Sequence, residues 1–194
     1  KLFDFHYMNN DSITYIAGHT GMLGSALLRL FTNRRFTNLI LASSRELDLR
    51  DQHAVNTFFD KKKPEYVILT AAKTGGINAN IKNPAEFLHD NLSIQNNVIH
   101  AAYKNGVKKL IFIGSSCVFP KESPQPMKEE YLLTGLLEPT NEGFALAKII
   151  GVKMLKNYYK QYGFESVSLI PCNLYGPNDS FDPEKSSVFP ALIK

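Results

Sequence analysis

The sequence has few cysteines and no long apolar run, and these two shortages argue against disulfide-linked, cysteine-metal and membrane-spanning classes of protein. Its 194 residues include only two cysteines, Cys117 and Cys172, which lie far apart and outside any Cys-x-x-Cys spacing. The sequence therefore predicts no metal site and no disulfide framework, and it fits a reducing cytoplasm. No apolar segment approaches the roughly 18 residues of a membrane-spanning helix. The opening residues, KLFDFHYMNNDS, lack the basic and apolar regions of a signal peptide. We expect a soluble, cytoplasmic protein.

A large excess of charge of one sign is also missing. The formal net charge is +4, and the lysines are dispersed apart from one run at 61–63 beside Pro64. That run is better explained as a solvated helix end than as a nucleic-acid patch. Because most aromatic residues follow core periodicity, we expect no nucleic-acid partner. The 44% hydrophobic content instead suits one sizeable packed domain.

Short apolar runs alternate with helical patterns along the chain, which indicates an α/β fold. The runs are ITYIAG (13–18), LILAS (39–43), YVILTAA (66–72), KLIFIGSS (109–116) and SVSLIP (166–171). Continuous apolar strands spaced by helices predict a Rossmann-like, doubly wound parallel sheet that is covered on both faces. Ligands of such sheets bind outside the carboxyl ends of the strands. The long irregular stretch 120–140 follows one strand end, and a loop of that length is more often functional than idle.

The first apolar run leads into GHTGMLG, in which Gly18, Gly21 and Gly24 lie three residues apart. Glycines let such a turn close tightly and let backbone N–H groups approach a pyrophosphate at the positive end of the next helix. The spacing is not Gly-x-Gly-x-x-Gly, and a tight turn without a ligand is the alternative. Its place between a strand and a helix favours a dinucleotide site.

The end of the second strand indicates which nicotinamide cofactor is bound. A carboxylate there grips the free ribose hydroxyl of NAD(H), whereas a 2′-phosphate needs donors and positive charge. The sequence places Ala42, Ser43, Ser44 and Arg45 at this point, with no acid among them. We therefore predict NADP(H). Glu46 follows immediately, and in a different loop geometry it would weaken this interpretation.

Further cofactor contacts are expected after the second and third strands. Asp48 and Leu49 are placed near the adenine, with the alternative that Asp48 caps the next helix, since DLRDQHAVNTFF offers such a start. Lys73 in AAKTGG follows a strand end near the expected nicotinamide ribose, where its charge would assist phosphate or substrate binding. A solvated lysine is the alternative.

The stretch NEGFALAK (141–148) raises the question of catalysis. Lys148 lies four residues after Phe144, and Ser115 ends the fourth predicted strand. In reductases with a serine and a Tyr-x-x-x-Lys pair, the serine holds the carbonyl and the tyrosine protonates the developing alkoxide. The lysine lowers the tyrosine pKa and binds the cofactor ribose. Phenylalanine has no proton to give.

The motifs AGHTGMLGSAL, AAKTGGI, NLSIQNNVIHAA, GSSCVFP, LEPTNEGFALAK and NLYGPND span nearly the whole chain from Ile13 onward. In this combination the sequence resembles the extended short-chain dehydrogenase/reductase superfamily. Within it, the sequence is similar to the GDP-L-fucose synthase family, the NADP(H)-dependent GDP-4-keto-6-deoxymannose 3,5-epimerase-4-reductases. The resemblance implies a domain over 12–177 that binds NADP(H), and the start of a smaller substrate-binding domain, mostly absent from this chain, over 178–194. We expect residues 1–11 to be disordered or foreign to the domain.

The resemblance also assigns catalytic roles. It implies that Ser115 is the catalytic serine, Lys148 the catalytic lysine and Cys117 the epimerisation base, while Phe144 occupies the tyrosine position. A buried small hydrophobe is the alternative for Cys117. The epimerase histidine of the family corresponds to Ser187, and a serine titrates far too high to act as an acid near neutral pH.

The remaining site residues follow from the motifs and the resemblance together. The expected cofactor contacts are Gly18, Gly21, Met22, Leu23, Gly24, Ser43, Ser44, Arg45, Asp48, Leu49, Ala71, Ala72, Lys73, Lys148, Pro171, Asn173 and Leu174. Ser116 and Asn173 are expected to contact the sugar nucleotide. The resemblance further implies a homodimer through the helices that contain 91–103 and 144–158.

We therefore predict an NADP(H)-dependent epimerase/reductase of a 4-keto-6-deoxy GDP-sugar, impaired at Phe144 and Ser187. The alternatives are a 4-reductase of a related GDP-sugar without epimerase activity and a catalytically inactive dinucleotide-binding protein. Phe144 itself has three possible origins: an engineered Tyr→Phe change, a natural reductase that draws its proton from elsewhere, or loss of activity. The second departure, at Ser187, favours divergence over a single engineered change.

Overall fold

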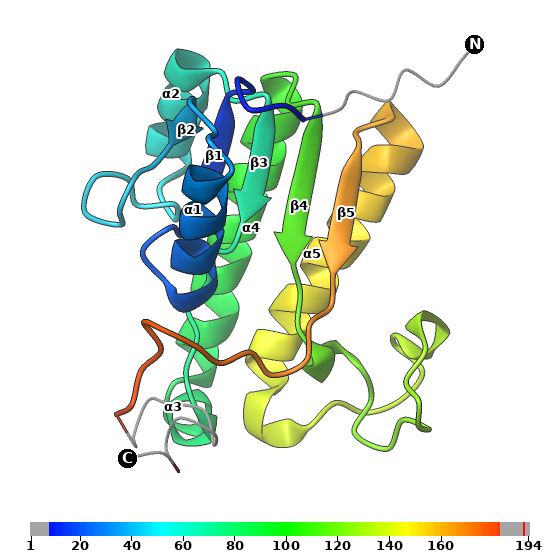
Figure 1. The fold of residues 1–194 in the computed structure, drawn as a ribbon. Helices are drawn as coiled ribbons and strands as arrows, with labels where there is room; N and C mark the ends of the chain where they lie inside the picture. The colour runs from blue at the N-terminus through cyan, green and yellow to red at the C-terminus, as the bar shows by residue number, and fades with distance from the viewer. Residues whose placement is uncertain (1–7, 183–191, 193–194) are drawn as a thin grey trace.

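The computed structural model describes residues 8–182 and residue 192, which form one α/β domain (Figure 1). Five parallel strands make one sheet in the order β2-β1-β3-β4-β5. The strands are β1 (Thr14–Ala17), β2 (Leu39–Ile40), β3 (Tyr66–Leu69), β4 (Lys109–Ile113) and β5 (Ser166–Leu169). All five were predicted from the apolar runs, and the doubly wound parallel sheet is confirmed. Each strand ends before its apolar run does, because the last residues of the run leave the ladder and enter loops at the carboxyl edge.

The helices cover the two faces of the sheet unequally. They are α1 (Met22–Asn33), α2 (Gln52–Lys62), α3 (Ile77–Lys82), α4 (Pro84–Lys104) and α5 (Glu142–Tyr162), with short 3₁₀ turns η1 (Ser116–Val118), η2 (Glu129–Tyr131) and η3 (Pro139–Asn141). In Figure 1, α1 lies in front of the sheet while α4 and α5 lie behind it. Along β5, Val167 and Leu169 are exposed. In the part of the chain that the structure describes, no helix covers this side of β5.

The main core lies between the sheet and the helices behind it. Tyr15, Leu110 and Phe112 of the sheet pack there against Phe59 of α2 and Leu155 of α5, and all five are buried. These are large apolar side chains, so their removal from water supplies most of the driving force that docks the helices. The core therefore fixes α4 and α5 against the strands whose carboxyl ends carry the site.

The starts of two helices follow the local sequence. Pro84 occupies the first position of α4, where its missing N–H costs no hydrogen bond. The cap of α2 is Asp51, whose side chain accepts a hydrogen bond from Ala54 N at 3.0 Å. The alternative that Asp48 caps this helix is therefore wrong, because Asp48 is paired with Arg50 at 2.8 Å instead. No helix among the described residues has the length and apolarity to cross a membrane.

The residues just before β1 are attached to the turn that follows α1. Asn10 Nδ2 donates to Arg34 O at 2.9 Å, and Thr37 N donates to Asn10 O at 2.9 Å. Asn38 Nδ2 donates to Asp11 O at 2.7 Å. Residues 10 and 11, which we had placed outside the domain, are thus hydrogen-bonded to it.

Candidate functional site

The candidate site lies at the carboxyl edge of the sheet. Strand β1 has β2 on one side and β3 on the other, so the chain reverses its direction of winding at this point. Loops on either side of such a reversal diverge and leave a crevice in which ligands bind. The predicted site residues leave the sheet at this edge in two groups, one at the glycine turn and one after β4.

The glycine turn is too crowded to hold side chains at two of its three glycines. Gly18 has a φ of +91°, and a Cβ there would lie 2.6 Å from Ala71 N. A Cβ on Gly24 would lie 2.0 Å from Gly18 O. Gly21 is the N-cap of α1 and no side chain caps that helix, so its first backbone N–H groups remain available. The turn therefore keeps β1, α1 and the segment after β3 in close contact and leaves a positive helix end free for an anion.

We expect Gly24→Ala to destabilise the domain by about 1–3 kcal/mol, because the clash is with backbone and cannot be relieved by rotating a side chain. Thermal unfolding followed by circular dichroism measures this effect. Gly21→Ala is the matched control, because its Cβ would make an ordinary contact of 3.5 Å with Gly18 O. Equal melting temperatures for the two variants would contradict this account of the turn.

The loop after β2 differs from the sequence prediction in the position of Glu46. Its carboxylate folds back and accepts hydrogen bonds from Ser43 N at 2.8 Å and Ser43 Oγ at 2.7 Å. These bonds hold the pKa of Glu46 below its usual range, so the group stays ionised. An acid therefore does lie beside the strand end, together with the exposed Ser44 and Arg45. The sequence analysis named Glu46 as the residue that would weaken the NADP(H) interpretation, and its return to Ser43 depends on the turn geometry.

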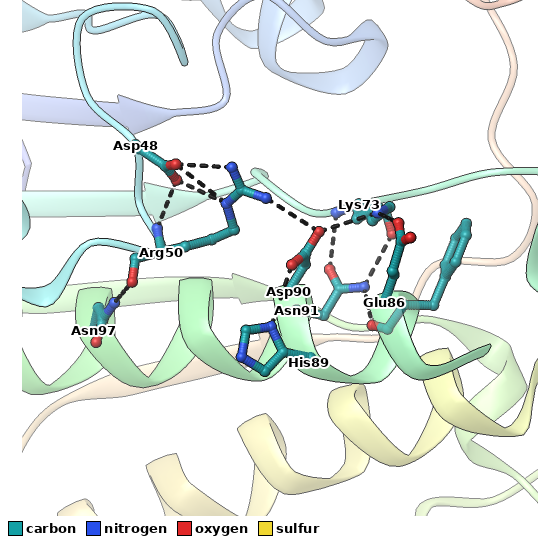
Figure 2. Close-up of polar contacts among 9 residues, drawn as sticks. Asp48, Arg50, Lys73, Glu86, His89, Asp90, Asn91 and Asn97 are labelled. Atoms are coloured by element: carbon teal, nitrogen blue, oxygen red, sulfur yellow. Dashed lines mark hydrogen bonds and ion pairs between the residues drawn. The ribbon is translucent and has the colours of Figure 1, made fainter. Parts of the chain in front are cut away.

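Lys73 is held in place through both its backbone and its side chain (Figure 2). Asn91 Oδ1 accepts from Lys73 N at 2.9 Å, and Asn91 Nδ2 donates to Lys73 O at 3.0 Å. Lys73 Nζ is paired with Glu86 and, at 3.1 Å, with Asp90. Lys73 is therefore not the solvated lysine of the alternative interpretation. Its ammonium group is fixed to α4 near the segment after β3.

Asp48 belongs to the same network. Arg50 pairs with Asp48 at 2.8 Å and with Asp90 at 3.4 Å, so the charges run continuously from the loop after β2 to the loop after β3 (Figure 2). Nearby, Asn97 Nδ2 donates to the carbonyls of Leu49 and Arg50, at 3.0 Å each. The network connects two loops that were both predicted to contact cofactor. No sequence pattern predicted that Asn91 and Asn97 hold these two loops through hydrogen bonds to their backbone.

The second group of predicted residues lines a cavity of about 430 Å³ beyond β4. The cavity brings together Ser115, Ser116, Cys117, Phe144 and Asn173, which come from three separate segments of the chain. The other lining residues are Gly75, Asn80, Phe119, Pro120, Lys121, Ser123, Gln125, Met127, Glu138 and Asn141. None of these residues was predicted individually, and most of them lie on loops.

The loop 120–140 forms one wall of the cavity, and its two ends are joined. Lys121 Nζ pairs with Glu138 at 3.1 Å, and Lys121 N donates to Leu136 O at 2.9 Å. Glu138 also caps η3 by accepting from Thr140 N. The wall is therefore fixed to the start of α5, the helix that carries Phe144 and Lys148. This agrees with the expectation that the long loop has a function.

Lys148 is a buried cation close to the cavity. Its side chain is 5% exposed, and Nζ donates to Ile113 O at 2.8 Å. Nζ lies 4.8 Å from the ring centre of Phe112 and 5.6 Å from that of Phe144. Burial lowers the pKa of Lys148 to about 8, and the nearby Cys117 opposes this shift only in part. Buried lysines without a carboxylate partner are typical of functional sites rather than of stable cores.

Cys117 lies in the cavity with its Sγ 3.2 Å from Ser115 Oγ. Burial raises the pKa of its thiol, although the Ser115 hydroxyl and the charge of Lys148 both act in the opposite direction. A thiol acts as a base only when its pKa is lowered far enough to give the thiolate. In this structure the partners are present but burial outweighs them, so the thiol is protonated near neutral pH.

We therefore expect Cys117 to react with iodoacetamide at least about tenfold more slowly than the exposed Cys172 at pH 7.5. Peptide mapping by mass spectrometry over a time course measures both rates in one sample. In 8 M urea the two rates should converge, which serves as the control. Faster labelling of Cys117 than of Cys172 in the folded protein would show that its thiolate is stabilised after all.

The other predicted residues are placed as follows. Met22 and Leu23 lie in the first turn of α1, and Ala71 contacts the glycine turn, with Ala72 next to it. Pro171 follows β5, and Leu174 is exposed in the same segment. Ser187 lies outside the described residues. The structure thus assembles a glycine-turn group and a cavity group on one edge of the sheet.

Comparison with known proteins supports this arrangement. The chain matches the model of the NAD dependent epimerase/dehydratase family over residues 14–194. GDP-L-fucose synthase 1 of Arabidopsis thaliana is 55% identical over 180 residues, which are 93% of this chain and 56% of that protein. The chain thus spans about half the length of the curated relatives it matches, and the predicted resemblance to the GDP-L-fucose synthases is confirmed.

Two solved structures from Campylobacter jejuni are also similar. A GDP-D-glycero-L-gluco-heptose synthase, determined in the presence of NADPH, has a TM-score of 0.92 and 47% identity, covering 96% of this chain and 55% of that one. A GDP-mannoheptose C4 reductase with NADP bound has a TM-score of 0.85 and 47% identity, covering 88% and 54%. The chain therefore belongs to the NAD dependent epimerase/dehydratase family.

Proposed function

We propose that this chain binds NADP(H) and forms the cofactor-binding part of a reductase of 4-keto GDP-sugars. The observation that carries the proposal is the cavity after β4, which places Ser115 and the ring of Phe144 together with Lys148 buried beside them. This is the arrangement in which a carbonyl oxygen is held and its developing negative charge is stabilised. The relatives named above act on GDP-sugars and include a C4 reductase.

The residues present fit a dinucleotide. The glycine turn closes tightly at Gly18 and Gly24, and the first turn of α1 has no side-chain cap, so its backbone N–H groups are available to a pyrophosphate. Lys148 offers a cation that the described residues leave without a carboxylate partner. We assign NADP(H) rather than NAD(H) because two similar structures contain NADP or NADPH and because Arg45 is exposed at the end of β2. Bound NADPH would supply a hydride to the carbonyl carbon.

The protein's own groups would act on the carbonyl oxygen. Ser115 Oγ is positioned to donate a hydrogen bond to it, and the positive charge of Lys148 would stabilise the alkoxide as it forms. Phe144 supplies no proton, so Ser115 or water must do so. Losing a general acid typically reduces the rate by about 10² to 10⁴. With phenylalanine at position 144, the proposed reductase is therefore slow.

A second candidate function is 3,5-epimerisation before reduction, which is the activity implied by the similarity to GDP-L-fucose synthases. It is favoured by the presence of Cys117 in the cavity next to Ser115. It is disfavoured by the raised pKa of that thiol and by a serine at position 187. We therefore place reduction first.

The proposal is tested by following NADPH oxidation with GDP-4-keto-6-deoxymannose, using the full-length protein that contains this chain. We expect slow oxidation with this substrate and none with GDP-mannose, which has no keto group. NADPH binding without any turnover would instead identify an inactive dinucleotide-binding protein. Absence of both binding and turnover would refute the proposal.

We also propose that α4 and α5 form a homodimer interface. The C-terminal ends of these two helices carry a cluster of aromatic rings, in which Tyr103 stacks on Tyr162 with ring centres 4.4 Å apart. Tyr159 and Tyr162 are 58% and 49% exposed, which is unusual for large side chains and typical of contact surfaces. Sedimentation velocity should give a dimer, and replacing both tyrosines with serine should give a monomer.

A further inference from the structure

We propose that Asn80, Ser123 and Asn141 form a subsite of the cavity that recognises sugar hydroxyl groups and thereby selects the sugar. This inference deepens the proposed function and depends on it. The three residues come from α3, from the loop 120–140 and from η3, so no sequence motif unites them. They come together because α3 packs against η3 and the loop 120–140 lines the same cavity.

The first observation is a set of buried polar atoms without partners. Asn80 Oδ1, Ser123 Oγ and Asn141 Oδ1 are buried and form no hydrogen bond. Buried polar atoms in proteins are nearly always paired, so each exception needs an explanation. Among the described residues only one other side-chain atom shares this state, His19 Nδ1 in the glycine turn. All three residues of the proposed subsite line the same cavity as Ser115.

The second observation is the chemical character of these atoms. Both N–H groups of the Asn80 amide are already used, because Nδ2 donates to Gly75 O and Gly76 O at 3.0 Å each. These bonds fix the orientation of the amide and leave its oxygen as the free atom. Asn80 is only 7% exposed and lines the cavity, so we take a group bound in the cavity as the partner that its buried oxygen lacks. An amide oxygen can only accept, so the ligand must donate.

The hydrogen-bonding character of the cavity therefore differs between the side that carries Ser115 and the proposed subsite. Ser115 and Ser116 offer hydroxyl donors to a carbonyl oxygen, whereas Asn80 and Asn141 offer acceptors. A phosphate or keto oxygen has no proton for an amide oxygen and would be rejected there. A sugar hydroxyl can donate to these acceptors and can also accept from Ser123. A sugar whose carbonyl is held at Ser115 would place its hydroxyl groups toward the remaining lining of the same cavity.

The subsite is positioned by rigid elements. Asn141 is the N-cap of α5 and stands three residues before Phe144, so its place relative to the reacting centre is set by the helix. The wall that carries Ser123 is closed by the Lys121–Glu138 ion pair. Sites that hydrogen-bond a substrate hydroxyl from fixed groups discriminate strongly against analogues that lack it, because the protein atoms are then left unpaired.

Asn141 is the best residue for a test because its side chain makes no capping hydrogen bond to α5, so its replacement costs the fold little.

The probes are GDP-mannose and its 2-deoxy, 3-deoxy and 6-deoxy analogues, titrated calorimetrically into the full-length protein saturated with NADP⁺. We expect the unmodified protein to bind the 2-deoxy or the 3-deoxy analogue about tenfold or more weakly than GDP-mannose. The 6-deoxy analogue lacks the same hydroxyl as the proposed substrate and should bind as well as GDP-mannose. Asn141→Leu should abolish that difference, and Asn141→Asp, which keeps an acceptor oxygen, should retain it. Asn56→Leu on the exposed face of α2 is the matched control and should leave all affinities unchanged.

The outcomes separate this inference from the proposed function. Equal affinity of the unmodified protein for all four probes would overturn the subsite while leaving the reductase intact. Full discrimination by Asn141→Leu, with unchanged NADP⁺ binding to show that it is folded, would also overturn it. If the unmodified protein bound NADP⁺ but none of the four GDP-sugars, the subsite would be overturned, whereas the proposed function fails only if NADPH oxidation with GDP-4-keto-6-deoxymannose is also absent.

Discussion

Replacing Phe144 with tyrosine should raise the rate of 4-keto reduction by about 10²- to 10⁴-fold, the usual contribution of a positioned general acid. The ring of Phe144 already lines the cavity beside Ser115, and its centre lies 5.6 Å from Lys148 Nζ. A phenol introduced there would lie next to a buried cation, which favours the phenolate and so lowers the phenol pKa toward neutrality. The change adds one oxygen and keeps the ring, so the packing around it stays nearly the same. NADPH oxidation under saturating substrate measures the gain.

Phe119→Tyr is the matched control for this prediction, because Phe119 lines the same cavity but is not among the aromatic residues close to Lys148. It should leave the rate unchanged. If Phe144→Tyr were no faster than the unmodified protein, another group would already supply the proton. Our assignment of the missing acid would then be incorrect.

Replacing Lys148 with methionine should stabilise the fold at pH 7 by about 2 kcal/mol. A pKa lowered from 10.5 to about 8 corresponds to a destabilisation on the order of 3 kcal/mol. The loss of the hydrogen bond to Ile113 O offsets about 1 kcal/mol of the gain. Methionine fills a similar volume with no charge to bury. Urea unfolding at several pH values measures the difference.

The lowered pKa of Lys148 also predicts how the stability difference between Lys148→Met and the unmodified protein changes with pH. Below pH 8 Lys148 is charged in both the folded and the unfolded chain, so the unmodified protein carries the full burial cost. Between pH 8 and about 10.5 the folded protein releases its proton while the unfolded chain keeps it, so the stability of the unmodified protein rises with pH. The advantage of Lys148→Met should therefore be largest below pH 8 and vanish near pH 10.5. Lys156→Met, at an exposed position on the same helix, should show no such trend. A constant advantage across this range would contradict the buried-charge explanation.

A cation kept at such a cost needs a function, and the proposed one is to stabilise negative charge on the substrate and to bind cofactor ribose. The same Lys148→Met variant should therefore be more stable but less active. Proteins commonly sacrifice stability at sites where activity requires a strained or desolvated group. A gain in stability together with a loss of activity distinguishes a functional lysine from one that is merely tolerated.

The fold was largely predictable because its signals are local. Five apolar runs gave five strands, and Pro84 marked the start of α4. The cap of α2 was less predictable, since the alternative interpretation named Asp48 although Asp51 lies ahead of the same amphipathic segment. Arg50 decides it by pairing with Asp48, which leaves Asp51 to accept the bond from Ala54 N. Such a competition between neighbouring side chains has no signature in periodicity.

The site was predictable only in part, for the same reason. The glycine turn, Ser115 and Lys148 belong to motifs with fixed spacing, and parallel strands bring their carboxyl ends to one edge. The return of Glu46 to Ser43 and the engagement of Lys73 with α4 depend on loop geometry. The unpaired oxygen of Asn80 is still harder to foresee, because an absent hydrogen bond is a property of the packed structure alone.

Transfer of deuterium from NADPH to the sugar would show the proposed reduction itself. The full-length protein is incubated with GDP-4-keto-6-deoxymannose and NADPH that carries deuterium at the transferable C4 position, long enough to allow for slow turnover. Our account predicts a product with one deuterium bound at C4 of the sugar, seen by mass spectrometry and NMR. Oxidation of the cofactor without deuterium at that carbon would contradict it.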